Sequence, residues 1–221
     1  MQLELLRTEV LRTANLLSQY GLVWMAGGTV CARDSQTGYV VVTPSGLPYE
    51  KLSPEDMVVT DIDMKPVEGK YRPSVALNLW TSLLRARPDL QAVVHTHSPY
   101  ATAFAVAGQP IPVVTETMAD WFGRSVSVTP YRSVDDPEFA SLPVEILGEG
   151  FAVLLGNHGV ITVGASLAHA LERAVTLEEA AHTYVISKSI GTPCYLNDAQ
   201  AMASFVYYFN QYGQRTTQSQ E

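Results

Sequence analysis

The chain is 221 residues long; 47% of its residues are hydrophobic and 16% are charged. These proportions are typical of a folded globular protein and exclude a disordered chain. The formal net charge of −8 disfavours broad binding to nucleic acids or to anionic membranes. The two cysteines, Cys31 and Cys194, are far apart in the sequence, so we expect no disulfide framework.

The first segment, MQLELLRTEVLRTANLL, mixes charged residues among its apolar ones. We interpret it as an amphipathic helix and not as a signal peptide. No apolar run approaches the roughly 20 residues that span a bilayer. We therefore expect a cytoplasmic protein with neither a membrane partner nor a nucleic-acid partner. We expect one domain over residues 1–214 and a polar, disordered tail over residues 215–221.

The first part of the chain predicts a helix, several strands and a second helix. Residues 2–19 carry apolar side chains three or four positions apart, which is the spacing of one helix face. After a pair of glycines, residues 39–42 predict a buried strand, and residues 57–70 predict two short strands joined by a turn. A helix over residues 74–86 ends before Pro88.

The second part of the chain predicts a similar mixture of elements. In order, these are a strand that carries His95 and His97, a helix at 98–107, strands at 111–118 and 125–132, a short helix at 137–149, two strands around a tight turn at 151–164, a long helix at 166–190 with Ser166 as its N-cap, and a last helix at 198–212. This order predicts a single α/β domain whose central sheet is mostly antiparallel or mixed and is covered by helices.

Two histidines two positions apart close the apolar run AVVHTHS. If this run is a strand, His95 and His97 project to the same face, because side chains alternate along a strand. Histidine is the commonest metal ligand, and two imidazoles on one face are able to share one ion. The alternative is a pair of histidines that pack and form hydrogen bonds at the end of a strand.

A third histidine, His158, lies in the turn GNHGV after another apolar strand. Glycines on both sides permit a close backbone approach, which is common where a side chain is aimed into a site. Taken alone, the motif is equally typical of a simple hairpin turn. Together with His95 and His97, it predicts a divalent metal held by three histidines, with a coordination position left open.

A set of motifs in this order resembles the class II aldolase/adducin superfamily, and the resemblance covers almost the whole chain. The motifs are GGTV at 27–30, TPSG at 43–46, RPS at 72–74, HTH at 95–97, MADWFG at 118–123, NHG at 157–159 and YGQ at 212–214. MADWFG and YGQ are more similar to L-ribulose-5-phosphate 4-epimerases than to L-fuculose-phosphate aldolases. The resemblance implies a class II aldolase-like α/β fold.

The resemblance also implies an activity. Enzymes of this family make or break a carbon–carbon bond in a small ketose, and a divalent metal acts as a Lewis acid that stabilises the enediolate. Aldolases stop at cleavage, whereas epimerases rejoin the bond with the opposite configuration. We therefore expect an isomerase or lyase of carbohydrate metabolism, acting on a sugar or sugar phosphate. The expected cofactor is one divalent metal ion per chain. Zinc is the expected metal, and manganese and cobalt are the alternatives.

The family pattern assigns roles to individual residues. It makes His95, His97 and His158 the metal ligands. Asp120 matches the acid/base aspartate of the epimerases, and Tyr212 matches their C-terminal acid/base tyrosine. Residues in the substrate-binding motifs are Gly28, Thr29, Ser45, Gly46 and Ser74. Because the family forms homotetramers with sites at the subunit interfaces, Asp120 and Tyr212 are expected to serve a neighbouring subunit.

The sequence departs from the family at positions that carry chemistry. After RPS the family has a serine and then a metal-binding carboxylate, but this chain has Val75 and Ala76. The histidine usual four residues later is Trp80, and Thr29 replaces an asparagine that faces the substrate phosphate. Neither Val75 nor Ala76 is able to bind a metal or accept a proton.

Three functions are compatible with these departures. The first is an epimerase that works through the three histidines with Asp120 and Tyr212, since that mechanism depends less on the carboxylate than aldol cleavage does. The second is an aldolase, or a decarboxylase acting on a different substrate. The third is a non-catalytic, adducin-like assembly module, which Ala76 favours. Glu116, two residues before the MAD motif, is a candidate replacement for the lost ligand or an ordinary surface residue.

Overall fold

A computed structural model of the chain describes residues 1–213. The predicted tail at 215–221 and Gln214 of the YGQ motif lie outside the described residues. The α-helices of the described part are α1 (Glu4–Gln19), α2 (Leu77–Ala86), α3 (Pro99–Ala107), α4 (Glu116–Phe122), α5 (Ser141–Leu147), α6 (Leu167–Ile190) and α7 (Asp198–Gln211), and two short 3-10 helices are η1 (Tyr49–Lys51) and η2 (Pro54–Asp56). None of the helices within residues 1–213 combines the length and the apolar character that crossing a membrane requires.

The strands form one sheet. They are β1 (Thr29–Arg33), β2 (Val40–Val42), β3 (Val58–Thr60), β4 (Pro66–Glu68), β5 (Ala92–Thr96), β6 (Ala152–Leu155) and β7 (Gly159–Gly164). Their order across the sheet is β4-β3-β2-β1-β5-β7-β6, and each neighbouring pair is antiparallel. The predicted α/β domain with a mostly antiparallel sheet is confirmed. β5 lies between β1 and β7, so the histidines it carries are near the centre of the sheet.

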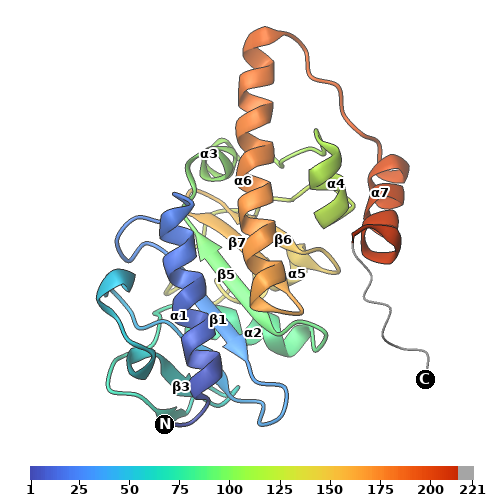
Figure 1. Cartoon of the computed structure of the whole chain (residues 1–221). Coiled ribbons are helices and arrows are strands. Elements are labelled where there is room, and N and C mark those ends of the chain that lie inside the picture. Colours follow the sequence, from blue (N-terminus) through green and yellow to red (C-terminus); the bar gives the residue numbers. More distant parts are fainter. Residues whose placement is uncertain (214–221) are drawn as a thin grey trace, which may run out of the picture.

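Helices cover both faces of the sheet (Figure 1). Because side chains alternate along each strand, Val30 and Val94 join the apolar cluster under α1 and α6. Their neighbours Cys31 and Val93 face the other way and pack with α2 and α5. His95 lies two positions after Val93, so it projects toward the α2 side of the sheet.

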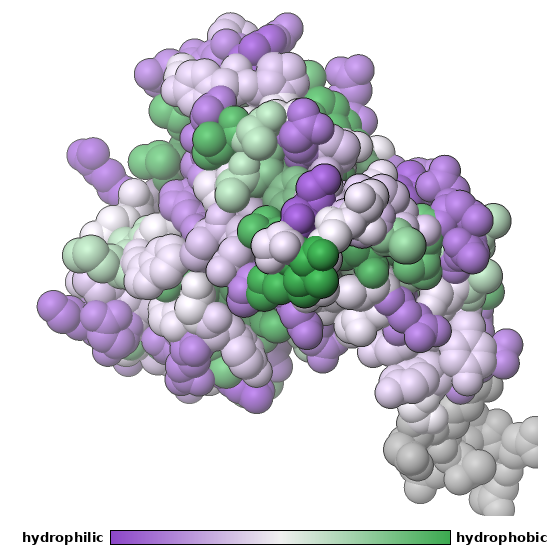
Figure 2. Space-filling model, turned by 90° about the horizontal axis from the view of Figure 1, so that it is seen from above, coloured by the Kyte–Doolittle hydropathy of each residue, from purple (hydrophilic) through white to green (hydrophobic). Residues whose placement is uncertain are grey.

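A third apolar cluster joins the second half of the chain. Helix α3 packs against α6, and the last helix, α7, packs against α4. The second half of α6 extends beyond the sheet toward the top of Figure 1. Seen from that end, the surface shows apolar side chains gathered in patches among polar ones (Figure 2). Exposed apolar residues on α6 and in the segment after it include Val185, Ile186, Ile190 and Tyr195.

The predicted helices are confirmed to within a few residues, and so is the hairpin around His158. Two predicted strands, at 111–118 and 125–132, are wrong. Those segments make only isolated bridges, Ile111 with Val126 and Val128 with Leu154. The helix α4 begins instead inside the first segment, because the Thr115 hydroxyl accepts a hydrogen bond from the Met118 amide and so caps it.

Two further differences concern the neighbourhood of the site. Strand β1 was not predicted, although it pairs with β5 and places Thr29 directly opposite His95. The strand that carries the histidines ends at Thr96, so His97 is the first residue after it. His97 nevertheless lies beside His95, as the alternation of side chains predicted.

Candidate metal centre and active site

His95 is held in place by the neighbouring strand. It is only 5% exposed, and its Nδ1–H donates a hydrogen bond of 2.8 Å to the Val160 carbonyl on β7. A carbonyl oxygen only accepts hydrogen bonds, so the proton of the neutral ring lies on Nδ1. The lone pair of Nε2 is therefore directed away from β7, toward His97 and His158. A backbone partner of this kind commonly orients metal-binding histidines.

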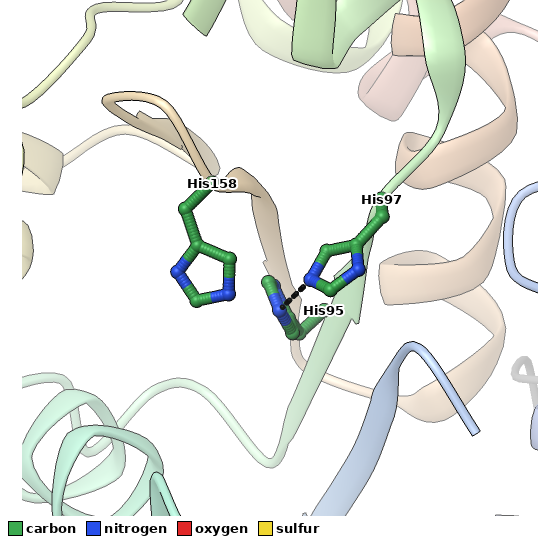
Figure 3. Close-up of side chains that lie close together, drawn as sticks. All are labelled: His95, His97 and His158. Atoms are coloured by element: carbon green, nitrogen blue, oxygen red, sulfur yellow. Dashed lines mark hydrogen bonds between the residues drawn. The ribbon is translucent and has the colours of Figure 1, made fainter. Parts of the chain in front are cut away.

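The other two histidines reach the same point from different segments (Figure 3). His97 places its Nε2 3.0 Å from His95 Nε2. His158 comes from the turn between β6 and β7, where Asn157 has a positive φ of 56°. The three ring centroids are 4.8 to 5.1 Å apart. One nitrogen of each histidine lies within 4.8 Å of the others, and this is the one such group of potential metal ligands found among residues 1–213.

Glycines allow this close packing. A Cβ atom at Gly159 would lie 2.5 Å from the Thr96 carbonyl oxygen and 2.7 Å from His97 Cδ2. A Cβ atom at Gly28 would lie 2.7 Å from the His95 carbonyl oxygen. Each position therefore requires glycine for steric reasons.

Burial keeps the three imidazoles neutral. It is the main cause that lowers the pKa of each ring below its ordinary value. The pKa of His95 is lowered further by the neighbouring charges of His158 and then His97, and that of His158 by the charge of His97. A metal binds the unprotonated nitrogen, so these are the protonation states that a metal requires.

The donor set fits a divalent ion. Two nitrogen ligands of a tetrahedral zinc ion lie about 3.3 Å apart, because Zn–N distances are near 2.0–2.1 Å. The 3.0 Å between the Nε2 atoms of His95 and His97 is close to this spacing. Three protein ligands leave a position for a water or a substrate, which distinguishes catalytic zinc sites from closed structural ones.

A cavity of about 490 Å³ opens over the three histidines. Its walls come from the loops before β1 and after β2, the start of α2, and residues 131–134. All the residues predicted to bind substrate line it, namely Gly28, Thr29, Ser45, Gly46 and Ser74. The fold therefore brings the predicted metal ligands and the predicted substrate-binding residues to one cavity.

A family model described as the class II aldolase and adducin N-terminal domain matches residues 8–185. The chain belongs to this family. A 5-deoxy-D-ribulose 1-phosphate aldolase of Bacillus thuringiensis serovar kurstaki is 34% identical over 215 residues, covering 97% of this chain and 100% of the relative. An L-ribulose-5-phosphate 4-epimerase UlaF of Salmonella paratyphi B is 37% identical over 187 residues, covering 79% of this chain and 81% of the relative.

Solved structures agree with the family assignment. An L-fuculose 1-phosphate aldolase superposes with a TM-score of 0.88 at 27% identity, covering 92% of this chain and 95% of that one. YgbL of Escherichia coli, described as a putative aldolase/epimerase/decarboxylase, has a TM-score of 0.82 at 27% identity, covering 91% and 98%. The relatives of this class II aldolase family member are thus sugar-phosphate aldolases and epimerases, and the predicted class II aldolase-like fold is confirmed.

Position 76, where the family resemblance implied a carboxylate, is part of an apolar wall. Ala76 lines the cavity and is 6% exposed. Trp80 is 1% exposed, and its ring centroid is 5.3 Å from that of His95. The indole N–H donates a hydrogen bond of 3.1 Å to Ser74 Oγ, which is 3.2 Å from Thr29 Oγ1. Trp80 therefore fills the wall and fixes Ser74, without supplying a replacement ligand.

Asp120 and Tyr212 do not line the cavity of their own chain. Asp120 lies on α4, where it accepts a hydrogen bond of 2.6 Å from Ser204 Oγ on α7. Tyr212 follows α7, is 64% exposed and stacks on Tyr208. Burial raises the pKa of Tyr208, and the charges of Glu172, Tyr212 and Asp120 raise it further. The two predicted acid/base residues thus lie in one neighbourhood, apart from the histidines. Their roles stay predictions.

Other residues with potential ligand or nucleophile side chains lie outside the cavity. Glu116 is exposed at the start of α4 and does not line the cavity. The ring of His182 stacks on Tyr100 at 3.9 Å, and His169 packs near Trp121. Burial raises the pKa of the Cys31 thiol, which keeps it protonated and unreactive.

Part of the cavity wall was not predicted from the sequence. Residues 131–134 and Phe139 line the cavity, and none of them was singled out. Arg132 is the charged residue among them. The spacing of apolar residues in this segment favours a strand, and no local pattern links it to the distant residues that form the rest of the cavity. Only the three-dimensional arrangement reveals the contribution of this segment.

We predict that the purified chain binds one zinc ion, and that His97→Ala abolishes stoichiometric binding because only two ligands remain. The measurement is elemental analysis after stripping and reloading with zinc. His182→Ala is the matched control and keeps the metal, since this ring stacks on Tyr100. Zinc retained by His97→Ala, or absent from the unmodified protein, would contradict the assignment of the three-histidine site.

We also predict that Gly159→Ala destabilises the protein, because its methyl group would overlap the Thr96 carbonyl and displace His97. The expected loss in the free energy of unfolding is about 1–3 kcal/mol, with weaker zinc binding. Urea denaturation measures the first effect. Gly191→Ala is the control, since a methyl group added there would have no heavy atom within 4 Å. Equal stability of the two variants would show that the close contact at Gly159 is tolerated.

Proposed function

We propose that this protein is a metal-dependent enzyme that breaks and rejoins a carbon–carbon bond in a small ketose phosphate, in the manner of an L-ribulose-5-phosphate 4-epimerase. The observation that carries this proposal is the group of three neutral histidines at the base of a cavity, in a chain of the class II aldolase family. When bound, a divalent metal supplies Lewis-acid stabilisation of the negative charge that develops during bond cleavage.

The phosphate of the substrate would bind at the wall formed by Thr29, Ser45, Gly46 and Ser74. Trp80 directs its indole N–H at Ser74 Oγ. The indole is a donor only, so Ser74 accepts from it and keeps its own hydroxyl hydrogen for Thr29 or for a ligand. Hydroxyl groups and backbone N–H groups are able to hold a phosphate without a lysine or arginine.

Proton transfer is assigned to Asp120 and Tyr212. Ala76 has no group that exchanges a proton. It is therefore unable to carry out the proton transfer that a carboxylate at this position performs in aldol cleavage. This absence favours epimerisation. Aldol cleavage is the second candidate, because the 5-deoxy-D-ribulose 1-phosphate aldolase matches over its whole length. The third hypothesis, a non-catalytic assembly module, is also compatible with Ala76. It predicts no turnover of any ketose phosphate.

We further propose that the protein is a homotetramer whose active sites lie between subunits. Neither Asp120 nor Tyr212 lines the cavity of its own chain. Both lie near Tyr208, and therefore near each other. A second subunit that presents this region would complete the site. The exposed apolar side chains on the projecting half of α6 are suited to burial in such an assembly.

We predict that Asp120→Asn lowers kcat for interconversion of L-ribulose 5-phosphate and D-xylulose 5-phosphate by about 10²–10⁴-fold, the usual contribution of an acid/base group. Metal content and oligomer size are expected to stay unchanged, because asparagine still accepts the bond from Ser204. Glu116→Gln, on the same helix and exposed, is the matched control with full activity. Full activity in Asp120→Asn would overturn its assignment, while release of an aldehyde product would identify an aldolase.

We predict that co-refolded mixtures of Asp120→Asn and His97→Ala chains regain activity that neither variant has alone. If each site combines histidines from one subunit with Asp120 from another, about a quarter of the sites in an equal mixture carry both intact residues. Light scattering establishes the tetramer, and an activity assay measures the recovery. If mixing of the two variants in one tetramer is demonstrated and no activity is recovered, the whole site lies within one subunit.

A further inference from the structure

We infer that Arg132 is an anion-binding residue of this cavity and that the cavity binds sugar-acid phosphates, which carry a carboxylate in addition to the phosphate, more tightly than matching phosphates without a carboxylate. The inference rests on the proposed function for the identity of the site, and it goes beyond that function by naming a second class of ligand. It is carried by the position of Arg132 in the cavity wall, by the charges around that cavity, and by the ion pair that Arg132 makes.

The position of Arg132 brings it next to the metal ligands. Arg132, Phe139 and His158 line the main cavity, and the same three residues line a smaller cavity that adjoins it. They therefore meet where the two spaces join. Phe139 is 4% exposed and packs in the apolar cluster under α2 and α5, so it anchors this end of the segment. Arg132 is thus presented to the cavity by a segment that is fixed in the core.

The charges of the cavity favour an anion. Of the lining residues in the described part of the chain, Arg132 is the one with a permanent charge, and none is a carboxylate. The loss of the family carboxylate at Ala76 removes a group that would repel a second anion in the same space. A ligand with a carboxylate therefore meets a positive side chain in the wall, and the carboxylates nearest to it, Glu138 and Asp136, pair with Arg132 without lining the cavity.

Arg132 already binds the carboxylate of Glu138, and a ligand carboxylate is able to take its place. Its Nε and Nη2 donate to Glu138 Oε2 at 2.9 and 2.7 Å, and Asp136 lies 3.6 Å away. Its Nη1 donates to its neighbour's carbonyl, that of Tyr131, at 3.0 Å. The side chains of Arg132 and Glu138 are 33% and 59% exposed. Ion pairs this accessible to water stabilise a fold little, so exchange of Glu138 for a ligand carboxylate costs little.

The competing interpretation is that Arg132 only ties residues 131–138 together. The two roles predict opposite effects at Glu138. If the pair is a structural tie, loss of either partner loosens the segment and neither change improves ligand binding. If Arg132 is a binding residue, Glu138 competes with the ligand, so its removal strengthens binding of a carboxylate.

The test is isothermal titration calorimetry on the full-length, zinc-loaded protein with two matched probes. 4-Phospho-D-erythronate carries a phosphate and a carboxylate, whereas erythritol 4-phosphate has the same carbon chain with an uncharged end. We expect the unmodified protein to bind the first more tightly. We expect Arg132→Ala to weaken binding of 4-phospho-D-erythronate by about 10-fold, as loss of a charge-assisted pair implies, and to leave erythritol 4-phosphate within about twofold.

Three more variants make the result specific. Glu138→Gln is expected to bind 4-phospho-D-erythronate several-fold more tightly, and Arg132→Lys to keep part of the preference. Arg85→Ala is the matched control: Arg85 also forms an exposed pair, with Asp63, but does not line the cavity. Its affinities should equal those of the unmodified protein. Thermal unfolding of each variant verifies that it is folded.

Several results would overturn the inference. These are equal affinity of the unmodified protein for the two probes, no binding of either, a preference that persists in Arg132→Ala because the carboxylate contacts the metal instead, or weaker binding in Glu138→Gln. The measurement needs no turnover, so it is separate from the proposed function. A carboxylate preference that depends on Arg132, without activity on any ketose phosphate, would overturn the proposed function alone.

Discussion

The antiparallel pairing of β5 with β7 is the constraint on which the site depends. It places Thr96 opposite Val160 and His95 opposite Ile161. This register brings the Val160 carbonyl within reach of His95 Nδ1 and starts β7 immediately after His158. A shift by one residue would turn His95 to the opposite face, toward α1 and α6. The hydrogen bond, the turn and the convergence of the three histidines are therefore consequences of one strand pairing.

Glycine and tryptophan adapt the surroundings to that pairing. Gly159 and Gly28 permit backbone to approach the histidines more closely than any other residue would. On the opposite side, Trp80 fills the space beside Ala76 and directs its N–H at Ser74. The result is a cavity with a polar wall of hydroxyl groups, an apolar wall, three neutral imidazoles and one guanidinium group. Ala76 adds an apolar group and no carboxylate to this cavity.

The parts of this fold that were predictable from sequence are those with local signals. The period of apolar residues predicted α1, and Ser166 marked the start of α6. The spacing of His95 and His97 predicted their shared face. Alternating residues at 111–118 misled the assignment, because the Thr115 cap and the packing of Met118 in the third cluster favour a helix there. Strand β1 is short and follows two glycines. Arg132 lines the cavity together with residues that are distant in the sequence. Neither leaves a local pattern.

The cavity is assembled from segments spread over most of the chain, from Ala26 to His158. The three imidazoles converge only after β1, β5 and β7 have paired, so a partly folded chain offers no high-affinity place for an ion. Binding is thereby linked to completion of the sheet. The same contacts are non-local, which makes their formation a slow part of folding. An ion held by these histidines would thus selectively stabilise finished molecules, and its binding would depend on completed folding.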